Sequence, residues 1–537
     1  MHATTRPNLL IAAAILALVL PSAARAQSGG NFSRAADSPL HYTLAPEHPS
    51  RSCASLRDAL PADTTATSAS IVPAHGEVPE HCRVRGLIAP AIRFEVNLPT
   101  DWSRRIYMFG NGGYAGEDLD APARRDLSDG ALRRGFATTQ TNTGHDARRQ
   151  PLGTFMGDDA KLVDYAFRAV HRTLDTAKRL AAVYYGRPAA FSYWDGCSTG
   201  GRQGLMSAQR FPDDFDGILD GAPVLNFVDT MIVYVWNAKA LAGTGLTVDK
   251  AKTIARAAYT RCDAEDGLAD GLIADPRRCD FDVERDVPQC PAGQDGADCL
   301  TPAQAEAVSK IYAGITRPDG SHYFFGYPKG AEVVGAASDG SDRQVSGWER
   351  WFIGVNGEPS QQTLYMSSFM RYGAFGREET DFDPARFDFG RDPARMDEIR
   401  ALLNANDPDL SGFRRHGGKL LMYHGWADTA LTPFMSIDYY ERATKINGPD
   451  TPDFFRLFMI PGMAHCRGGV ATDRFDGISA LVNWVENGAA PDRITAERML
   501  DGKLVRSRPL CPYPQSAVYS GTGSIDEAGN FVCKDPR

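Results

Sequence analysis

Positive charge, long apolar runs and paired cysteine motifs are all scarce in this chain of 537 residues. Its 58 Lys and Arg residues are outnumbered by 67 Asp and Glu residues, and the net charge of −9 offers no electrostatic surface for nucleic acid or anionic membranes. After residue 20 no segment approaches the length of a membrane span. Paired CxxC spacing is missing, which argues against a zinc ribbon. We therefore expect no nucleic-acid partner, and small neutral or weakly anionic substrates fit the charge.

The first 26 residues have the pattern of a signal peptide. Arg6 supplies a modest positive start, residues 9–20 are apolar, and Ala24-Arg25-Ala26 fits a cleavage site. We expect residues 1–26 to be removed, the mature chain to begin near Gln27, and the protein to be periplasmic or secreted with no membrane attachment after cleavage. An uncleaved anchor is the alternative, although the apolar stretch is short for a membrane span.

Ser198 is the candidate nucleophile and lies in the sequence Gly-Cys-Ser-Thr-Gly at 196–200. Residues 190–194 alternate like a half-buried strand and residues 201–208 begin a helix, which predicts the strand, sharp turn and helix of a nucleophile elbow. An ordinary glycine turn is one alternative, because this pattern also occurs by chance in glycine-rich chains. Cys197 as the nucleophile is another, but its side chain would point away from the exposed tip of the elbow.

Asp428 and His465 complete a candidate catalytic triad. Each follows a predicted buried strand, at 419–423 and 454–460 respectively. The chain order Ser, Asp, His is that of α/β-hydrolases and not of chymotrypsin or subtilisin. Ser198 would attack once His465 takes its proton, while Asp428 would orient the imidazole and stabilise its charged form. The other ten histidines, His424 among them, are predicted to be structural or remain unassigned.

Ten cysteines, an even number, suit export to an oxidising compartment in which every one can pair. The sequence alone leaves their connectivity open. Cys197 directly precedes Ser198, and Cys466 directly follows His465. Because a disulfide brings two Cα atoms to about 5.5 Å, a bridge between these two cysteines would hold the candidate hydroxyl and imidazole at about hydrogen-bonding reach.

Acyl transfer also needs donors for the oxyanion. The backbone N–H of Thr199 is one expected donor, because it belongs to the residue after the nucleophile. A second donor should come from a glycine loop after an earlier strand, and residues 110–116 follow a predicted strand at 105–109. Gly113 is favoured, with Gly112 close behind. The alternative is a glycine turn without a ligand.

Together these motifs resemble the tannase and feruloyl esterase family of α/β-hydrolases. The resemblance rests on residues 196–201, Gly-Trp-Ala-Asp at 425–428, His465-Cys466, and Gly-Asn-Gly-Gly at 110–113. It implies an α/β-hydrolase fold, with a mostly parallel sheet flanked by helices, over essentially the whole mature chain. It also implies the triad, the oxyanion donors Gly113 and Thr199, and the Cys197–Cys466 disulfide. With local spacing, it suggests four further disulfides: Cys53–Cys82, Cys262–Cys279, Cys290–Cys299 and Cys511–Cys533.

A large insertion is expected between Ser198 and Asp428, because the chain is too long for one compact hydrolase core. We place a lid domain at 225–408, between two parts of the catalytic domain at 27–224 and 409–537. An amphipathic pattern at 162–180 predicts a core helix before the nucleophile strand. Lids at this position usually shape the substrate pocket. Candidates for its aromatic wall are Trp348, Trp351, Phe352, Phe369, Tyr372 and Phe375, and Arg350 or Arg371 could pair with a substrate carboxylate.

An acidic loop at 263–272 lies within this predicted lid. Its carboxylates are the hard oxygen ligands that calcium prefers, although the spacing is not that of an EF-hand. From spacing alone, a calcium site and a solvated acidic turn are equally good interpretations. The family resemblance favours a structural calcium ion, and it implies the ligands Asp263, Asp266 and Asp270 with the carbonyls of Leu268 and Leu272.

The sequence thus predicts an exported serine carboxylesterase that hydrolyses small esters of aromatic acids through an acyl-enzyme intermediate. No organic cofactor is expected. A serine peptidase or amidase is one alternative, because the triad by itself does not exclude amides. A catalytically silent binding protein with the hydrolase fold is another, and a thiol redox protein that uses Cys197 is a third.

Overall fold

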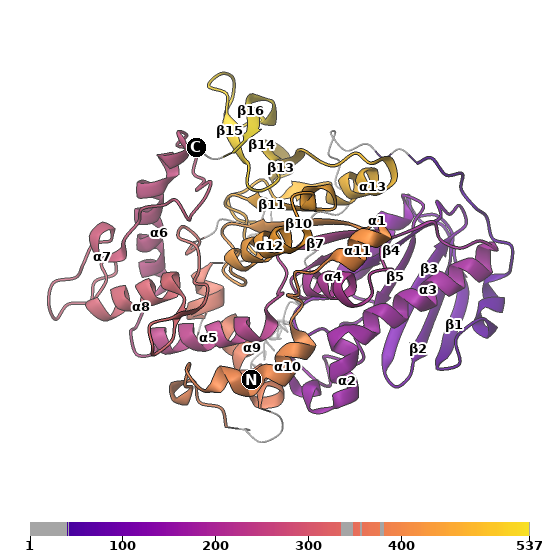
Figure 1. The fold of residues 1–537 in the computed structure, drawn as a ribbon, viewed down its shortest axis with the longest axis horizontal. Coiled ribbons are helices and arrows are strands. Elements are labelled where there is room, and N and C mark those ends of the chain that lie inside the picture. Colours follow the sequence, from indigo (N-terminus) through magenta and orange to yellow (C-terminus); the bar gives the residue numbers. More distant parts are fainter. Residues whose placement is uncertain (1–39, 41, 334–346, 355–356, 376–380, 536–537) are drawn as a thin grey trace, which may run out of the picture.

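A nine-stranded mixed sheet runs through the centre of the computed structural model (Figure 1). The structure describes residues 40, 42–333, 347–354, 357–375 and 381–535, so the predicted signal peptide lies outside it. The strand order is β1-β2-β3-β5-β4-β6-β7-β10-β11. The bounds are β1 Thr64–Val72, β2 His81–Ile88, β3 Ile92–Pro99, β4 Arg105–Phe109, β5 Ala137–Thr141, β6 Phe191–Cys197, β7 Gly217–Gly221, β10 Lys419–Gly425 and β11 Phe455–Ile460.

The sheet changes character along its width. Strands β1, β2, β3 and β5 pair antiparallel, whereas β5, β4, β6, β7, β10 and β11 pair parallel. Every residue of β4, β5 and β7 is buried, as expected of parallel strands covered on both faces. Because β6, β10 and β11 run in the same direction, the loops that carry Ser198, Asp428 and His465 leave the same edge of the sheet.

Helices cover both faces of the parallel part. Helices α1 (Pro122–Leu132) and α13 (Gly477–Asn487) pack into one apolar core, and α3 (Ala169–Tyr185), α4 (Thr199–Arg210) and α12 (Phe434–Asn447) pack into the other. This arrangement confirms the predicted α/β-hydrolase architecture.

Beyond β11 the chain forms a three-stranded sheet and a hairpin: β12 Arg474–Phe475, β13 Ile494–Leu500 and β14 Lys503–Leu510, then β15 Ser516–Tyr519 and β16 Phe531–Lys534.

The helix predicted at 162–180 is present, and it includes a π-helical turn that the sequence did not predict. The chain forms α2 (Asp159–Val163), a π-helical turn (Asp164–Arg168) and then α3. The guanidinium of Arg202 in α4 donates to the carbonyls of Tyr165 and Ala166, both at 3.0 Å. We attribute the wide turn to these contacts, because carbonyls turned toward a side chain no longer follow the regular helical pattern.

The chain between β7 and β10 adds no strand to the nine-stranded sheet within the described residues. It contains α5 Phe227–Leu241, α6 Val248–Cys262, α7 Val283–Asp286, α8 Pro302–Ala313, the short strands β8 Ile315–Thr316 and β9 His322–Phe324, α9 Gln361–Phe369, α10 Asp397–Leu403 and α11 Ser411–His416. In Figure 1, α5, α6, α7 and α8 lie together at one side of the sheet. The lid boundaries at 225 and 408 stay a prediction. None of the helices in the described ranges is long and apolar enough to cross a membrane.

A buried carboxyl group on β6 predicts a pH-dependent stability. Asp195 is 3% exposed and accepts a hydrogen bond from the Tyr107 hydroxyl at 2.6 Å. Burial raises the pKa of Asp195 to about 7, although the Tyr107 hydrogen bond opposes the shift. Because the pKa of Asp195 is higher in the folded than in the unfolded state, protonated Asp195 contributes to the free energy of unfolding. This contribution is complete below about pH 4 and is lost as the pH rises through about 7.

We therefore expect Asp195→Asn to remove about 2 kcal/mol of the decline in unfolding free energy between pH 5 and pH 8. Thermal or denaturant unfolding at several pH values measures this. Asp249→Asn, on an exposed carboxylate of α6, is the control and should keep the wild-type slope. Equal slopes for wild type and Asp195→Asn would contradict the assignment.

Candidate active site

Ser198 occupies a sharp turn between β6 and α4. Its backbone has φ 63° and ψ −118°, a left-handed conformation that non-glycine residues rarely adopt. Two hydrogen bonds hold the turn, from the Ser198 N–H to the Gly221 carbonyl at 2.9 Å and from the Val224 N–H to the Ser198 carbonyl at 3.2 Å. A Cβ on Gly196 would lie 2.5 Å from the Gly200 carbonyl oxygen, so glycine is needed where the strand and helix approach. The structure therefore has the predicted strand-turn-helix geometry.

His465 and Asp428 meet at the same edge. His465 Nδ1 lies 2.8 Å from Asp428 Oδ2, and the two side chains are almost completely buried. The backbone N–H groups of Ala430 and Leu431 donate to the other oxygen, Oδ1, at 2.8 and 2.9 Å. Burial alone would raise the pKa of Asp428, but the charge of His465 and hydrogen bonds from His424 and His465 hold it well below its usual range. Asp428 is therefore an ionised partner for the imidazole.

A disulfide joins the neighbours of the candidate nucleophile and base. Cys197 and Cys466 are bonded with their Cα atoms 6.0 Å apart, across 269 positions of sequence. The other four predicted pairs are also present: Cys53–Cys82, Cys262–Cys279, Cys290–Cys299 and Cys511–Cys533. Since the disulfide consumes the thiol of Cys197, the structure gives no support to the alternative that used it as a nucleophile.

The loop after β4 approaches the first turn of α4. The Thr199 hydroxyl donates to the carbonyl of Gly113, and the Tyr165 hydroxyl donates to the same carbonyl at 3.1 Å. The Gly112 N–H donates to the Glu117 carboxylate at 3.1 Å, whereas within the described residues the Gly113 N–H has no acceptor in the chain. Thr199 begins α4, so its N–H lacks a partner inside the helix. Gly113 and Thr199 are thus better placed as oxyanion donors than Gly112.

Gly113 requires its small size. Its φ is 52°, and a Cβ there would lie 2.7 Å from the Tyr365 hydroxyl. Tyr365 comes from α9 of the predicted lid and was not among the expected aromatic residues. Burial raises the pKa of Tyr365, and the positive charge of Arg350 opposes the shift. The sequence carried no signal for Tyr365, because the segments are 252 positions apart.

Trp351 is the expected aromatic residue that reaches the histidine. Its ring centroid lies 5.8 Å from that of His465 with an interplanar angle of 80°, an edge-to-face arrangement. Trp348 stacks on Phe352 inside the insertion, and Phe369 packs on Phe227. The expected wall residues Trp348, Phe352 and Phe369 therefore contribute to core packing. Tyr372 is exposed, and Phe375 stacks on Phe382. The structure assigns no role to Arg371.

His424, which the sequence leaves structural or unassigned, contacts Asp428 of the candidate triad. Its Nε2 lies 3.2 Å from Asp428 Oδ2, and the residue has no exposed surface. The available signal was its position at the carboxyl end of β10, four residues before Asp428, because residues at that edge point toward the same site.

The acidic loop is held mainly by its own backbone. Asp263 Oδ1 accepts from the N–H groups of Asp270, Gly271 and Leu272 at 2.9–3.2 Å. Asp270 also pairs with Arg508 at 2.5 Å. Burial raises the pKa of Asp266, and the negative charges of Asp270 and Asp263 raise it further, so these carboxylates repel one another. Among the described residues, no three His, Cys, Asp or Glu side chains form a group that could hold a metal ion. The oxygen donors suit calcium in type, whereas the Arg508 pair competes for one of them.

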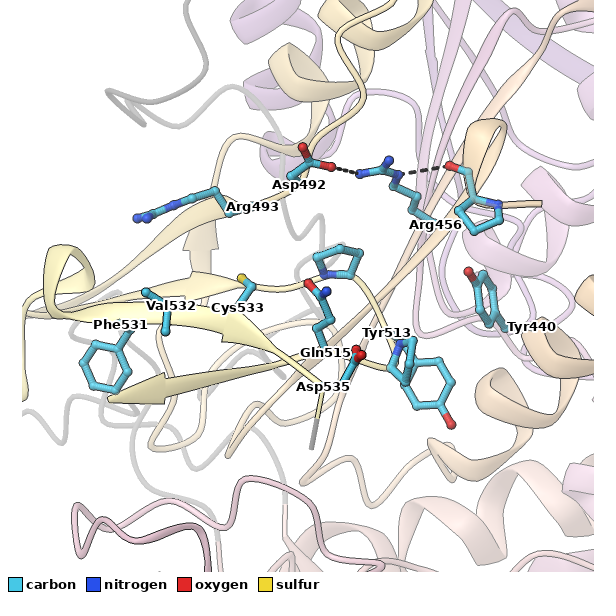
Figure 2. A pocket seen from close by; sticks show the side chains of 13 residues that line it. Tyr440, Arg456, Asp492, Arg493, Tyr513, Gln515, Phe531, Val532, Cys533 and Asp535 are labelled. Carbon is cyan, nitrogen blue, oxygen red and sulfur yellow. Dashed lines mark hydrogen bonds and ion pairs between the residues drawn. The ribbon is translucent and has the colours of Figure 1, made fainter. Parts of the chain in front are cut away.

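A groove of about 570 Å³ lies elsewhere, between α12, the start of β11 and the β15–β16 hairpin (Figure 2). Across it Arg456 pairs with Asp492 at 2.7 Å, and Tyr440 and Tyr513 line one end. Arg456 belongs to the amino end of β11, whereas His465 follows its carboxyl end. The groove is therefore at the opposite edge of the sheet from the candidate active site.

Comparisons with known proteins identify the family of the chain. The profile of the tannase and feruloyl esterase family matches residues 76–534. A mono(2-hydroxyethyl) terephthalate hydrolase from Piscinibacter sakaiensis is 34% identical over 90% of this chain and 88% of its own. An uncharacterised esterase from Xanthomonas campestris is 34% identical over 91% of this chain and 92% of its own. The crystal structure of feruloyl esterase B from Aspergillus oryzae superimposes with a TM-score of 0.76 at 27% identity, covering 90% of this chain and all of that one. The chain belongs to the tannase and feruloyl esterase family of carboxylic ester hydrolases.

Proposed function

We propose that this protein is an exported serine esterase that hydrolyses esters of aromatic acids through an acyl-enzyme intermediate. Ser198 is the nucleophile, His465 the general base and Asp428 the partner of His465. The observation that carries the proposal is the Cys197–Cys466 disulfide, which ties the neighbours of Ser198 and His465 together while His465 bonds Asp428 at 2.8 Å.

The reaction follows from what each group can do. His465 takes the hydroxyl proton of Ser198 as its oxygen attacks the ester carbonyl, and the N–H groups of Gly113 and Thr199 stabilise the oxyanion. Collapse of this intermediate breaks the bond to the alcohol, which leaves with the proton from His465. A water molecule then gives its proton to His465 and attacks the acyl-enzyme, releasing the acid and restoring Ser198.

The proposed acyl group is aromatic. Two relatives are named for esters of terephthalic and ferulic acids, and the rings of Trp351 and Tyr365 lie next to His465 and Gly113. A panel of methyl ferulate, methyl gallate and mono(2-hydroxyethyl) terephthalate, with methyl hexanoate and the matching anilides as controls, tests this. We expect an aromatic ester to have the largest kcat/KM. A faster anilide or hexanoate would overturn the proposal.

Thr199→Val is expected to lower kcat by about 10-fold with little change in KM, because loss of the hydrogen bond to Gly113 frees the oxyanion loop. The variant keeps the backbone N–H and the side-chain volume, so steady-state kinetics isolate the hydroxyl. Thr199→Ser, which retains the hydroxyl, is the matched control and should stay near wild type. Equal losses in both variants would contradict this role.

Export is proposed from the residues 1–26 and from the five disulfides. Sequencing the amino terminus of the protein recovered from the periplasm or the medium tests it. We expect the mature chain to start near Gln27. Recovery of the full-length chain from the cytoplasm would contradict export.

A structural calcium ion is proposed at Asp263, Asp266 and Asp270 with the carbonyls of Leu268 and Leu272. The raised pKa of Asp266 supports it, because a divalent cation would neutralise the repulsion from the charges of Asp270 and Asp263. The three carboxylates do not by themselves form a group that could hold a metal ion in the described residues, so the proposed site depends on the two carbonyls as well. We expect EDTA to lower Tm by several degrees, added calcium to restore it, and Asp263→Asn, which keeps the oxygen acceptor, to remove the effect. Elemental analysis showing no bound calcium, with Tm indifferent to EDTA, would overturn the proposal.

A further inference from the structure

Two imidazoles converge on one oxygen of Asp428. His465 Nδ1 lies 2.8 Å from Oδ2, and His424 Nε2 lies 3.2 Å from the same atom. With the N–H groups of Ala430 and Leu431 on Oδ1, the carboxylate has four donors around it. A carboxylate can accept about four hydrogen bonds, so this one is fully satisfied and cannot rotate without losing a donor.

The surroundings of His424 define its tautomer. Its Nε2 also lies 3.1 Å from the carbonyl of Leu431, and a carbonyl only accepts, so Nε2 carries a proton. Its Nδ1 lies 2.8 Å from the hydroxyl of Ser436, which can donate. A neutral imidazole with Nε2–H and an accepting Nδ1 therefore satisfies all its neighbours.

The two residues come from elements that pack together. His424 is on β10, Ser436 is in the first turn of α12, and both are fully buried. The hydroxyls of Tyr234 and Tyr327, both in the insertion, donate to the carbonyl of Ala430 at 2.7 and 3.2 Å. They therefore help to hold the loop that follows Asp428. Burial raises the pKa of both tyrosines, so they are neutral beside Asp428.

We propose that Ser436 and His424 support the candidate triad: Ser436 hydrogen-bonds Nδ1 of His424 and so orients its ring, and the Nε2–H of His424 holds the carboxylate of Asp428 in place for His465. His424 is a positioning residue, since it acts on the reaction only through Asp428. The inference rests on the proposed serine esterase function. Its Nε2–H also draws negative charge from the oxygen that faces His465, which limits how strongly Asp428 stabilises the protonated imidazole.

Three variants test this inference. His424→Phe fills the cavity without a donor and should lower kcat by about 10- to 100-fold with KM within about twofold. His424→Gln places an amide N–H near the position of Nε2–H and should recover at least about half of the lost factor on a logarithmic scale. Ser436→Ala removes the hydrogen bond to Nδ1 of His424, which leaves the ring less firmly oriented, and should lower kcat by about threefold or more.

The pH profile separates positioning from general damage. In His424→Phe the acidic limb of kcat/KM should move to higher pH, because the unshared charge of Asp428 favours protonated His465. His81→Phe, at a fully buried histidine of β2 remote from the site, is the control and should leave the limb and kcat unchanged. If His424→Phe does not fold, the pH profiles of His424→Gln and Ser436→Ala decide.

An unchanged kcat and acidic limb in Ser436→Ala and in whichever His424 variants fold would overturn the inference, as would equal losses in His424→Gln and His424→Phe. Labelling of Ser198 by a fluorophosphonate is measured in every variant. It separates a failure of the inference about His424 from a failure of the proposed function. If wild type is not labelled at Ser198, the serine mechanism itself fails. If it is labelled and the variants behave as wild type, only the role of His424 fails.

Discussion

Replacing Ser198 by alanine is expected to lower kcat for ester hydrolysis by about a million-fold, because no other group in the site can take the place of its oxygen. The variant removes one oxygen atom and leaves the Cys197–Cys466 disulfide and the His465–Asp428 hydrogen bond intact. Its fold and Tm should therefore remain close to those of wild type. Kinetics with the best aromatic ester measure the loss of turnover. One equivalent of a fluorophosphonate measures the loss of labelling at position 198.

Ser192→Ala is the matched control for this experiment. Ser192 is a buried serine of β6, six residues before Ser198, and its loss should leave both turnover and labelling intact. Retention of more than a hundredth of the wild-type kcat by Ser198→Ala would show that another residue is the nucleophile. Loss of labelling without loss of turnover would show that the probe reports a side reaction.

Removing the Cys197–Cys466 disulfide, as Cys197→Ala/Cys466→Ala, is expected to destabilise the folded state by about 5 kcal/mol. The loop that it closes spans 269 positions, and the loss of chain entropy in the unfolded state grows with the logarithm of loop length. We also expect kcat to fall by at least about tenfold, because Ser198 and His465 would then be held only by noncovalent contacts.

The Cys290–Cys299 disulfide offers a control of the same chemistry. It closes a loop of only 9 positions within the insertion, so Cys290→Ala/Cys299→Ala should cost about 2–3 kcal/mol and leave kcat unchanged. Denaturant unfolding and steady-state kinetics of both double variants measure the contrast. If the long-range variant keeps full kcat at a temperature at which it remains folded, the disulfide only stabilises the fold and does not position the site.

Much of the catalytic framework could be predicted from local sequence. The strand at 105–109 matches β4 residue for residue, and the strands before Ser198, Asp428 and His465 are present at β6, β10 and β11. These strands are short, apolar and buried on both faces, so they stand out against the glycine turns that follow them. The chain order Ser, Asp, His then predicts a triad of the α/β-hydrolase type.

Other features required the packed structure. The helix at 162–180 contains a π-helical turn at the two carbonyls that Arg202, on another helix, binds. The sequence already favours Gly113 over Gly112, but the reason is visible only in the structure, where the carboxylate of Glu117 accepts from the Gly112 N–H. Tyr365 enters the site from an insertion whose composition gave no sign of which aromatic ring would face the loop. Each depends on side-chain directions that periodicity does not describe.

The sequence by itself determined the identities and order of Ser198, Asp428 and His465, the cysteines beside them, and the glycines that permit sharp turns. These are properties of residue type and spacing. Only the tertiary structure decided that His424 shares Asp428 with His465 and that Thr199 holds Gly113. The physical reason is that a hydrogen bond depends on distance and direction between groups, and those are set when strands and helices from distant parts of the chain pack together.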